Sequence, residues 1–286
     1  AYTLLYLIGA VTILTSCVKD DLYDTPHPDR GAVVVTTDWS GKSTEADIPQ
    51  AYTLRIGGRE QNVSAATNVF DALLAPGGYG LTVYNSPEGI SIDGNKATVN
   101  PVDLTGAIEP HPGYLFASHQ DISVVADDTL HVTCESKLMV QRIVFNITVT
   151  NTGILEYTGI TAELDGVTTS RYVRTREKGS GFATLPFTVS PEKENFFRKE
   201  VLVFGINTGV SNVIRLHLDG DMPVDADLDL SDVFKDFTAD GISVDITVRV
   251  SPSLHTASAS IEDWQNVEWG QGIICLLYTS PSPRDR

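Results

Sequence analysis

Three thiols are the side chains with the widest chemical repertoire in this sequence: Cys17, Cys134 and Cys275. A thiol can form a disulfide, act as a nucleophile, bind a metal or carry a lipid. Cys134 follows His131 by three residues in DTLHVTC, a segment that alternates like a strand. Residues three apart on a strand point to opposite faces, so His131 cannot activate this thiol as a direct neighbour. We therefore expect Cys134 to be a small buried hydrophobic residue.

The histidines and the glycine-rich segments lack the spacing that catalysis or phosphate binding requires. No HExxH or Cys-His zinc pattern occurs, and His131 and His217 lie inside strand-like segments. There is no GxSxG nucleophile motif, and GGYG and GSG are followed by neither a P-loop lysine nor a long helix. The sequence thus predicts no catalytic residue and no enzymatic activity. It predicts no cofactor except the metal considered next.

Segment 225–236 is a cluster of carboxylates with the spacing of a metal loop. Asp225, Asp227, Asp229 and Asp236 match positions 1, 3, 5 and 12 of a calcium-binding loop, in which oxygen ligands converge from one tight turn. Leu230 stands where that loop needs glycine, and aspartate replaces the bidentate glutamate at the end. Alternation with apolar residues fits a strand with a solvated acidic face as well. Calcium binding and a solvated strand are therefore the two hypotheses for this segment.

Cys17 ends a segment that is typical of a signal peptide. Residues 1–16 carry no charge, and their apolar core is too short to span a bilayer comfortably. Without an initiator Met or a basic region, we expect the first few residues to be missing. The ending Leu-Thr-Ser-Cys at 14–17 resembles the bacterial lipobox, in which cleavage before the cysteine precedes its acylation. We predict that Cys17 carries acyl chains such as palmitate, which would hold the protein on a membrane. The alternative is an uncleaved anchor or an ordinary secretory signal.

Residues 275–286 do not continue any pattern of the chain. CLLYTSPSPRDR is similar to the conceptual translation of a transposon sequencing adapter, so we expect an assembly artefact. A natural Pro-rich tail is the alternative. With Cys17 lipidated and Cys275 excluded, Cys134 has no partner and no disulfide framework is expected.

The composition fits a folded acidic protein without nucleic-acid partners. Hydrophobic residues make up 42% and charged residues 20% of the chain, which is globular composition. The net charge is −17, and Lys and Arg form no run or stripe, so the electrostatic footprint of DNA or RNA binding is missing. Anionic head groups also repel an acidic surface, so membrane attachment needs a hydrophobic anchor.

Period-2 alternation separated by turn residues predicts an all-β protein from residue 32 onward. The expected strands of the first half are 32–39, 51–58, 79–85, 89–100, 113–118 and 128–134. Those of the second half are 139–151, 159–166, 181–189, 199–206, 212–220, 241–250 and 257–267. We expect short helices at 68–78 and after Ser231, with Ser231 as the N-cap. These elements predict two tandem antiparallel β-sandwich domains, 32–136 and 137–274, after a tether at 17–31.

The order of several segments resembles a family of bacterial surface proteins. These segments are the lipobox and acidic tether, DTPHPDRGAVVVTTDW, LLAPGGYGLTVYN, VFNITVTN, ITAELDGV and IEDWQNV. From residue 17 to 267, they resemble Bacteroidales surface lipoproteins of the fimbrillin and fimbrial-anchor type. The resemblance implies two transthyretin-like sandwiches on an outer-membrane lipid anchor, and subunits that join when a donor strand completes a neighbour's sheet.

The resemblance also implies an export signal and a glycosylation site. Lys19, Asp20 and Asp21 resemble the acidic surface-export signal that follows the lipidated cysteine in this phylum, although Val18 and Leu22 are less typical neighbours. Residues 128–130, Asp-Thr-Leu, resemble an O-glycosylation acceptor, which would place a glycan on Thr129 in an exposed turn.

Two functions are compatible with these features. The first is a non-enzymatic surface lipoprotein that acts as the anchor or an accessory subunit of a fimbria, or as an adhesin. The alternative is a carbohydrate-binding lipoprotein of a glycan-uptake system, in which exposed aromatic rings would stack on sugars. The aromatic candidates for that role are Trp39, Tyr79, Tyr84, Tyr114 and Trp264.

Overall fold

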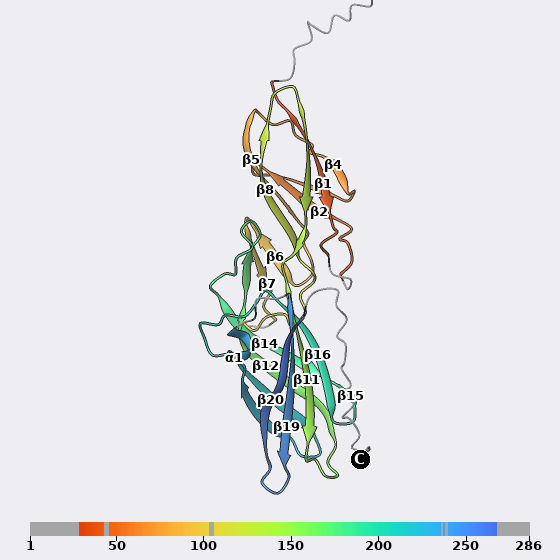
Figure 1. The fold of residues 1–286 in the computed structure, drawn as a ribbon, viewed down its shortest axis with the longest axis vertical. Coiled ribbons are helices and arrows are strands. Elements are labelled where there is room, and N and C mark those ends of the chain that lie inside the picture. Colours follow the sequence, from red (N-terminus) through yellow and green to blue (C-terminus); the bar gives the residue numbers. More distant parts are fainter. Residues whose placement is uncertain (1–28, 43–45, 103–105, 236, 238–239, 268–286) are drawn as a thin grey trace, which may run out of the picture.

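The computed structural model describes residues 29–42, 46–102, 106–235, 237 and 240–267. The predicted signal segment, Cys17 and the rest of the tether up to residue 28 lie outside these ranges, as do Asp236 and residues 275–286. The described strands form two β-sandwich units, which Figure 1 shows end to end along the longest axis. The fold is nearly all β, as the alternating sequence predicts.

The first unit consists of two sheets, with the strand orders β4-β1-β9 and β10-β8-β5-β2-β3. Its strands are β1 (Ala32–Asp38), β2 (Tyr52–Ile56), β3 (Arg59–Val63), β4 (Thr67–Val69), β5 (Gly77–Tyr84), β8 (Phe116–Val124), β9 (Thr129–Glu135) and β10 (Lys137–Leu138). Val33 and Val35 of β1 point inward with Leu54 and Ile56 of β2, because alternate residues of a strand share one face. Trp39 closes this core, with its ring edge-on to Tyr52 at 5.4 Å.

The second unit has the strand orders β15-β16-β11-β19-β20 and β14-β12-β17-β18. Its strands are β11 (Gln141–Thr150), β12 (Tyr157–Thr168), β14 (Phe182–Val189), β15 (Pro191–Lys193), β16 (Phe196–Val203), β17 (Val213–Gly220), β18 (Val224–Asp229), β19 (Gly241–Ser251) and β20 (Thr256–Val267). Phe145 of one sheet stacks on Phe187 of the other, with ring centroids 5.3 Å apart. The core of this unit is the larger of the two.

A hairpin from the first half of the sequence packs into the second unit. It consists of β6 (Ile90–Asp93) and β7 (Lys96–Val99), and β7 pairs with β13 (Ser170–Tyr172). Gly94 and Asn95 form the turn between these two strands, and Gly94 has a positive φ of 54°. Ile90, Ala97 and Val99 belong to the core of the second unit. The domain boundary at 136 and 137 stays a prediction, and this hairpin lies between the two sandwiches in Figure 1.

Arg55 of β2 connects the first unit to this hairpin. Its guanidinium donates hydrogen bonds to the Gly94 carbonyl, to the Tyr84 hydroxyl at 2.6 Å and to Glu60 Oε1 at 2.7 Å. The same guanidinium lies 4.8 Å from the centre of the Tyr84 ring. One side chain thus links β2, β3, β5 and the β6–β7 turn.

Each unit contains one parallel strand pair in sheets that are otherwise antiparallel. β1 runs parallel to β9, and β11 runs parallel to β19, whereas the expectation was of antiparallel sheets throughout. Parallel neighbours need a long connection, and here the intervening strands of the same unit provide it in place of a crossover helix.

The predicted helix at 68–78 is wrong. Its backbone hydrogen bonds go to β1, since Phe70 N–H donates to the Val33 carbonyl at 2.8 Å, and Gly31 and Leu74 exchange two such bonds. Phe70 and Leu74 are buried in the first core, whereas Leu73 is exposed. Tertiary pairing with β1 therefore overrides the helix-like apolar spacing.

The predicted short helix after Leu230 is present as α1 (Ser231–Lys235), but Ser231 is not its N-cap. The Leu230 carbonyl accepts the first helical bond, from Phe234 N–H at 3.0 Å. Ser231 is the first helical residue, and both its N–H and its hydroxyl donate to Asp229 Oδ1. The Asp229 carboxylate therefore stabilises the start of this helix in place of a serine cap.

Candidate functional site

The residues of the predicted lipid anchor and export signal lie outside the described part of the chain. These are Cys17, Lys19, Asp20 and Asp21, and their roles stay predictions. The first described residues lead into β1 at the free end of the first unit, where Gly31 pairs with Leu74. No helix among the described residues is both long and apolar enough to cross a membrane.

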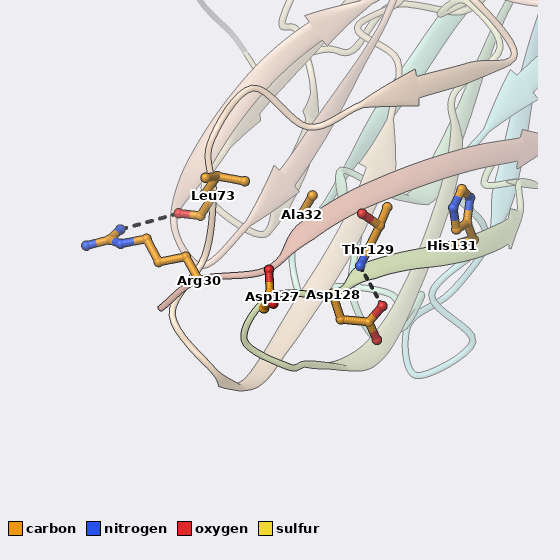
Figure 2. A pocket seen from close by; sticks show the side chains of 7 residues that line it. All are labelled: Arg30, Ala32, Leu73, Asp127, Asp128, Thr129 and His131. Carbon is orange, nitrogen blue, oxygen red and sulfur yellow. Dashed lines mark hydrogen bonds between the residues drawn. The ribbon is translucent and has the colours of Figure 1, made fainter. Parts of the chain in front are cut away.

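A hollow of about 480 Å³ lies at this end of the first unit, and Figure 2 shows the side chains that line it. Thr129, the first residue of β9, lines it, and its backbone N–H donates to Asp128 Oδ1 at 2.7 Å. The preceding turn contains Asp127 with a φ of 54°, and Arg30 binds the Leu73 carbonyl at 3.3 Å. Thr129 is exposed, as the O-glycosylation hypothesis requires, but it is the first residue of strand β9 and not part of the preceding turn. The modification itself stays a prediction.

Cys134 is a buried residue of the first core, as its strand context predicts. Its side chain is 2% exposed, and Gln120 Nε2 donates to its sulfur at 3.2 Å. Burial raises the pKa of the thiol to about 11, so the thiolate that nucleophilic chemistry needs is scarce at neutral pH.

The acidic segment 225–229 forms strand β18 and not a loop. Asp225, Asp227 and Asp229 alternate along it, so their Cα atoms lie about 7 Å apart, whereas calcium ligands must all lie about 2.4 Å from one ion. No group of three or more metal-binding side chains gathers among the described residues, and Asp236 lies outside them. The strand geometry supports the solvated-strand hypothesis for this segment. Calcium binding stays an untested prediction.

Across from β18, the carboxylates meet two basic residues of β17. Asp227 pairs in register with Arg215, and Asp225 pairs with His217. His217 Nδ1 lies 2.6 Å from Asp225 Oδ1, and Nε2 lies 3.5 Å from Asp219 Oδ1. The hydrogen bond to Asp225 and the neighbouring carboxylates raise the pKa of His217 above its usual range.

Arg215 is the centre of a polar cluster on the outer face of the four-stranded sheet. Its guanidinium lies 2.6 Å from Asp165 Oδ2 and 3.9 Å from Glu163 Oε2, both on β12. Thr184 of β14 donates to Asp165 Oδ1 at 2.8 Å. The hydrogen bond from Arg215 is the main reason that the pKa of Asp165 lies below its usual range.

Ordinary alternation along β12 presents Asp165 to this cluster, because Glu163 and Asp165 lie on the outer face on either side of the buried Leu164. A β-bulge follows: the register of β12 shifts between Leu164 and Val167, and Gly166 within the bulge has a φ of 79°. The alternation ends at this bulge, so Asp165 is the last residue of β12 in the regular outward series.

A hollow of about 840 Å³ adjoins this cluster, and we name it the Phe182 hollow. Its lining includes Glu163, Asp165, Phe182, Thr184, Pro186 and Ser211. A second hollow of about 380 Å³, over Arg215 and His217, shares Glu163 with it. The Phe182 side chain is 50% exposed, although it is large and apolar. The lining of the Phe182 hollow thus combines an aromatic ring with carboxylates and hydroxyls that are fixed by neighbouring strands.

Phe182 is not among the predicted aromatic candidates, although the sequence carries a signal for it. In GFATLPFTV, Leu185, Phe187 and Val189 share the inward face, which leaves Phe182, Thr184 and Pro186 on the outward face. An aromatic residue at outward parity is the feature that would have identified it. Of the five predicted aromatic candidates, Trp39 and Tyr84 are buried and Tyr79 and Tyr114 are half-buried, while Trp264 is 38% exposed.

Comparisons with known proteins identify the fold. Neither a protein-family model nor a curated protein matches the sequence. A proposed adhesin of Bacteroides ovatus has a TM-score of 0.55 and 15% identity, over 88% of this chain and 99% of its own. A proposed polysaccharide-binding protein of Bacteroides thetaiotaomicron has a TM-score of 0.55 and 10% identity, over 83% and 96%.

The fimbrial anchor protein Mfa2 of Porphyromonas gingivalis has a TM-score of 0.50 and 11% identity, over 82% of this chain and 97% of its own. At such identities the similarity concerns the fold, and it covers both sandwich units because between 82% and 88% of this chain is matched. The chain therefore has the β-sandwich fold of Bacteroidales adhesins and of a fimbrial anchor, as the fimbrillin-type resemblance of its sequence implies.

Proposed function

We propose that this chain is a non-enzymatic outer-membrane lipoprotein of the cell surface that acts as the anchor or an accessory subunit of a fimbria, or as an adhesin. The observation that carries the proposal is the fold shared with Mfa2 over 97% of that protein. The lipobox at Cys17 supports the same function, because it would place a lipid 15 residues before the start of β1 at Ala32. Bacteroides adhesins among the structural neighbours support the broader role in adhesion.

The arrangement of the units suits a protein attached at one end. The first described residues lie at the free end of the first unit, so a lipidated tether would join the molecule there. The turn between β19 and β20 lies at the opposite end in Figure 1, farthest from that attachment. Contacts with other surface components would then be made along the sheets or at the far end.

Association with fimbrial subunits would use strand addition at a sheet edge. The outer strands of the four main sheets are β4 and β9, β10 and β3, β15 and β20, and β14 and β18. An edge strand offers unpaired N–H and C=O groups, which an extended segment of a partner can bind. The partner would be a fimbrial subunit that supplies such a segment.

The lipid anchor is tested with the complete gene expressed in a Bacteroidales host that is fed an alkyne analogue of palmitate. We expect label on the wild type and on Cys134→Ala, and none on Cys17→Ala. External protease should digest the wild-type protein on intact cells. Protein without label, or protein protected until the cells are lysed, would contradict the proposal.

A second candidate function is carbohydrate binding within a glycan-uptake system. It is supported by the fold shared with a proposed polysaccharide-binding protein and by the exposed ring of Phe182. Co-purification of fimbrial subunits from cells would favour the first function. Co-purification of a glycan-uptake transporter would favour the second.

A further inference from the structure

We propose that the outer face of β14, β12 and β17 is a binding site for an uncharged oligosaccharide, centred on the Phe182 hollow. This inference rests on the second candidate function, carbohydrate binding, and it is independent of lipidation at Cys17. A ring for stacking, fixed polar groups for hydroxyls, and an open hollow of suitable size together carry the inference.

Phe182 supplies the apolar part of the site. Burying apolar surface contributes a favourable free energy of about 25 cal/mol for each Å², and an exposed aromatic side chain on a sheet face does not gain it. Phe182 is 50% exposed and lines the hollow, as does Pro186 farther along β14. The C–H face of a pyranose ring is flat and apolar, so it can cover such a ring while its hydroxyls stay available for hydrogen bonds.

The polar part of the site is fixed before any ligand arrives. Asp165 is held by Arg215 at 2.6 Å and by Thr184 at 2.8 Å, so little side-chain entropy remains to be lost on binding. Each carboxylate oxygen can accept more than one hydrogen bond, and a guanidinium has five N–H donors, so unused bonding capacity remains. Neighbouring hydroxyls of a sugar need this combination of acceptors and donors.

The size of the hollow suits a sugar. Its volume of about 840 Å³ lies within the range of 300–1,000 Å³ that is typical of ligand sites. The adjoining hollow over Arg215 and His217 shares Glu163, so the polar surface continues across β17 to β18. More than one sugar residue can therefore be accommodated along this face.

Charge narrows the class of glycan. Arg215 neutralises one of the two carboxylates beside it, and Asp225 and Asp227 add negative charge across the face. The chain as a whole carries −17. Sulfated or uronate-rich glycans would be repelled, whereas neutral hexoses, deoxyhexoses and N-acetylated hexosamines would not.

The test is a glycan array probed with the purified full chain, carrying neutral, N-acetylated, uronate-containing, sulfated and free-amine oligosaccharides. We expect binding to neutral or N-acetylated members only. The strongest binder is then titrated by calorimetry, where Phe182→Ala should weaken binding at least tenfold. Arg215→Met should also weaken binding of this glycan, because Asp165 loses its partner.

Tyr172→Ala is the matched control, because it removes an exposed aromatic residue of β13 that lines neither hollow, and it should leave affinity unchanged. Trp264→Ala tests the competing stacking candidate on β20. Thermal unfolding of each variant checks that the fold is retained. Absence of binding to neutral glycans, or equal affinity of Phe182→Ala and wild type, would overturn the site. Loss with Trp264→Ala alone would also overturn it, and selective binding of free-amine sugars would replace it with a cation site. None of these results bears on the lipid anchor.

Discussion

At the scale of single residues, the chemistry of this protein is that of ion pairs and hydrogen bonds on a sheet surface. The thiol and histidine that the sequence places near each other, Cys134 and His131, belong to different faces of β9, so one is buried and the other exposed. The polar groups that do meet, Asp165, Arg215 and Thr184, come from three separate strands. Sequence spacing alone could not bring these three together, because only the sheet register makes them neighbours.

His217 provides a prediction at this scale. The carboxylate of Asp225 favours the imidazolium, so the pKa of His217 should exceed its usual value and fall towards it in Asp225→Asn. Asp227→Asn is the control, since Asp227 faces Arg215 and should leave His217 unchanged. NMR titration of the imidazole protons measures both. An unchanged His217 pKa in Asp225→Asn would contradict the contact.

The sign of the linked stability follows from the raised pKa. Protonated His217 is favoured in the folded state, so its contribution is fully present below about pH 6.5, the ordinary histidine value. That contribution is lost as the pH rises through the raised pKa. The urea midpoints of wild type and Asp225→Asn should therefore differ more at pH 6 than at a pH above the raised pKa of His217. The difference should be small because the pair is exposed.

At the scale of elements, most strands could be predicted from alternation, and the exceptions have physical reasons. β19 shows the predicted pattern, with Ile242 and Val244 buried and Asp245 exposed. The segment after β4 was predicted as a helix because Phe70, Leu73 and Leu74 have helical spacing, but its backbone bonds to β1. Such long-range pairing leaves no local signal. The parallel partners of β1 and β11 escaped prediction for the same reason.

The packing of this segment can be tested with two adjacent leucines. Leu74 is 6% exposed in the first core, whereas Leu73 is 49% exposed. Leu74→Ala should lower the free energy of unfolding by about 2–4 kcal/mol, because it removes buried methyl groups and leaves a cavity. Leu73→Ala should cost less than about 1 kcal/mol. Chemical denaturation measures both, and equal costs would contradict the arrangement described.

The bulge at Gly166 gives a second prediction for an element. A Cβ at Gly166 would lie 2.1 Å from Asn212 Nδ2, in a residue that also has positive φ, so Gly166→Ala must displace a buried side chain. Gly94→Ala is the control, since its φ is also positive but nothing lies within 4 Å. The control should cost roughly 1–2 kcal/mol from the left-handed backbone alone. Gly166→Ala should cost clearly more, and similar unfolding midpoints would contradict the clash.

At the scale of the whole molecule, the two sandwiches are joined by the β6–β7 hairpin and not only by the chain between them. Two units could be predicted because the strands form two series, and the resemblance suggested the same. The sequence could not show that the hairpin belongs to the second core. The alternation of apolar and polar residues around Ile90 and Val99 would fit a strand of either unit. Its attachment depends on pairing of β7 with β13, which lies more than 70 residues later in the sequence.

Arg55 allows this junction to be tested. Arg55→Ala removes the bonds to Gly94, Tyr84 and Glu60 together, so the first unit should lose its link to the hairpin. We expect faster amide hydrogen exchange at the β6–β7 turn. We also expect the first unit to unfold at a lower denaturant concentration. Arg59→Ala, at the exposed start of β3, is the control. Exchange at the turn that does not change would show that Arg55 does not hold the junction.

The parallel pairing of β1 with β9 has a mechanical consequence for a chain attached through its N-terminus. Tension on residue 29 acts along β1, whose partners run from Ala32 opposite Thr129 to Asp38 opposite Glu135. The evenly spaced, slanted hydrogen bonds of this parallel pair are then loaded in shear, so the whole row must break together and not one bond at a time. A strand held in this way resists force far better than a hairpin pulled apart from its open end. The tether would thus pull the sandwich along the direction in which this strand pair resists force best.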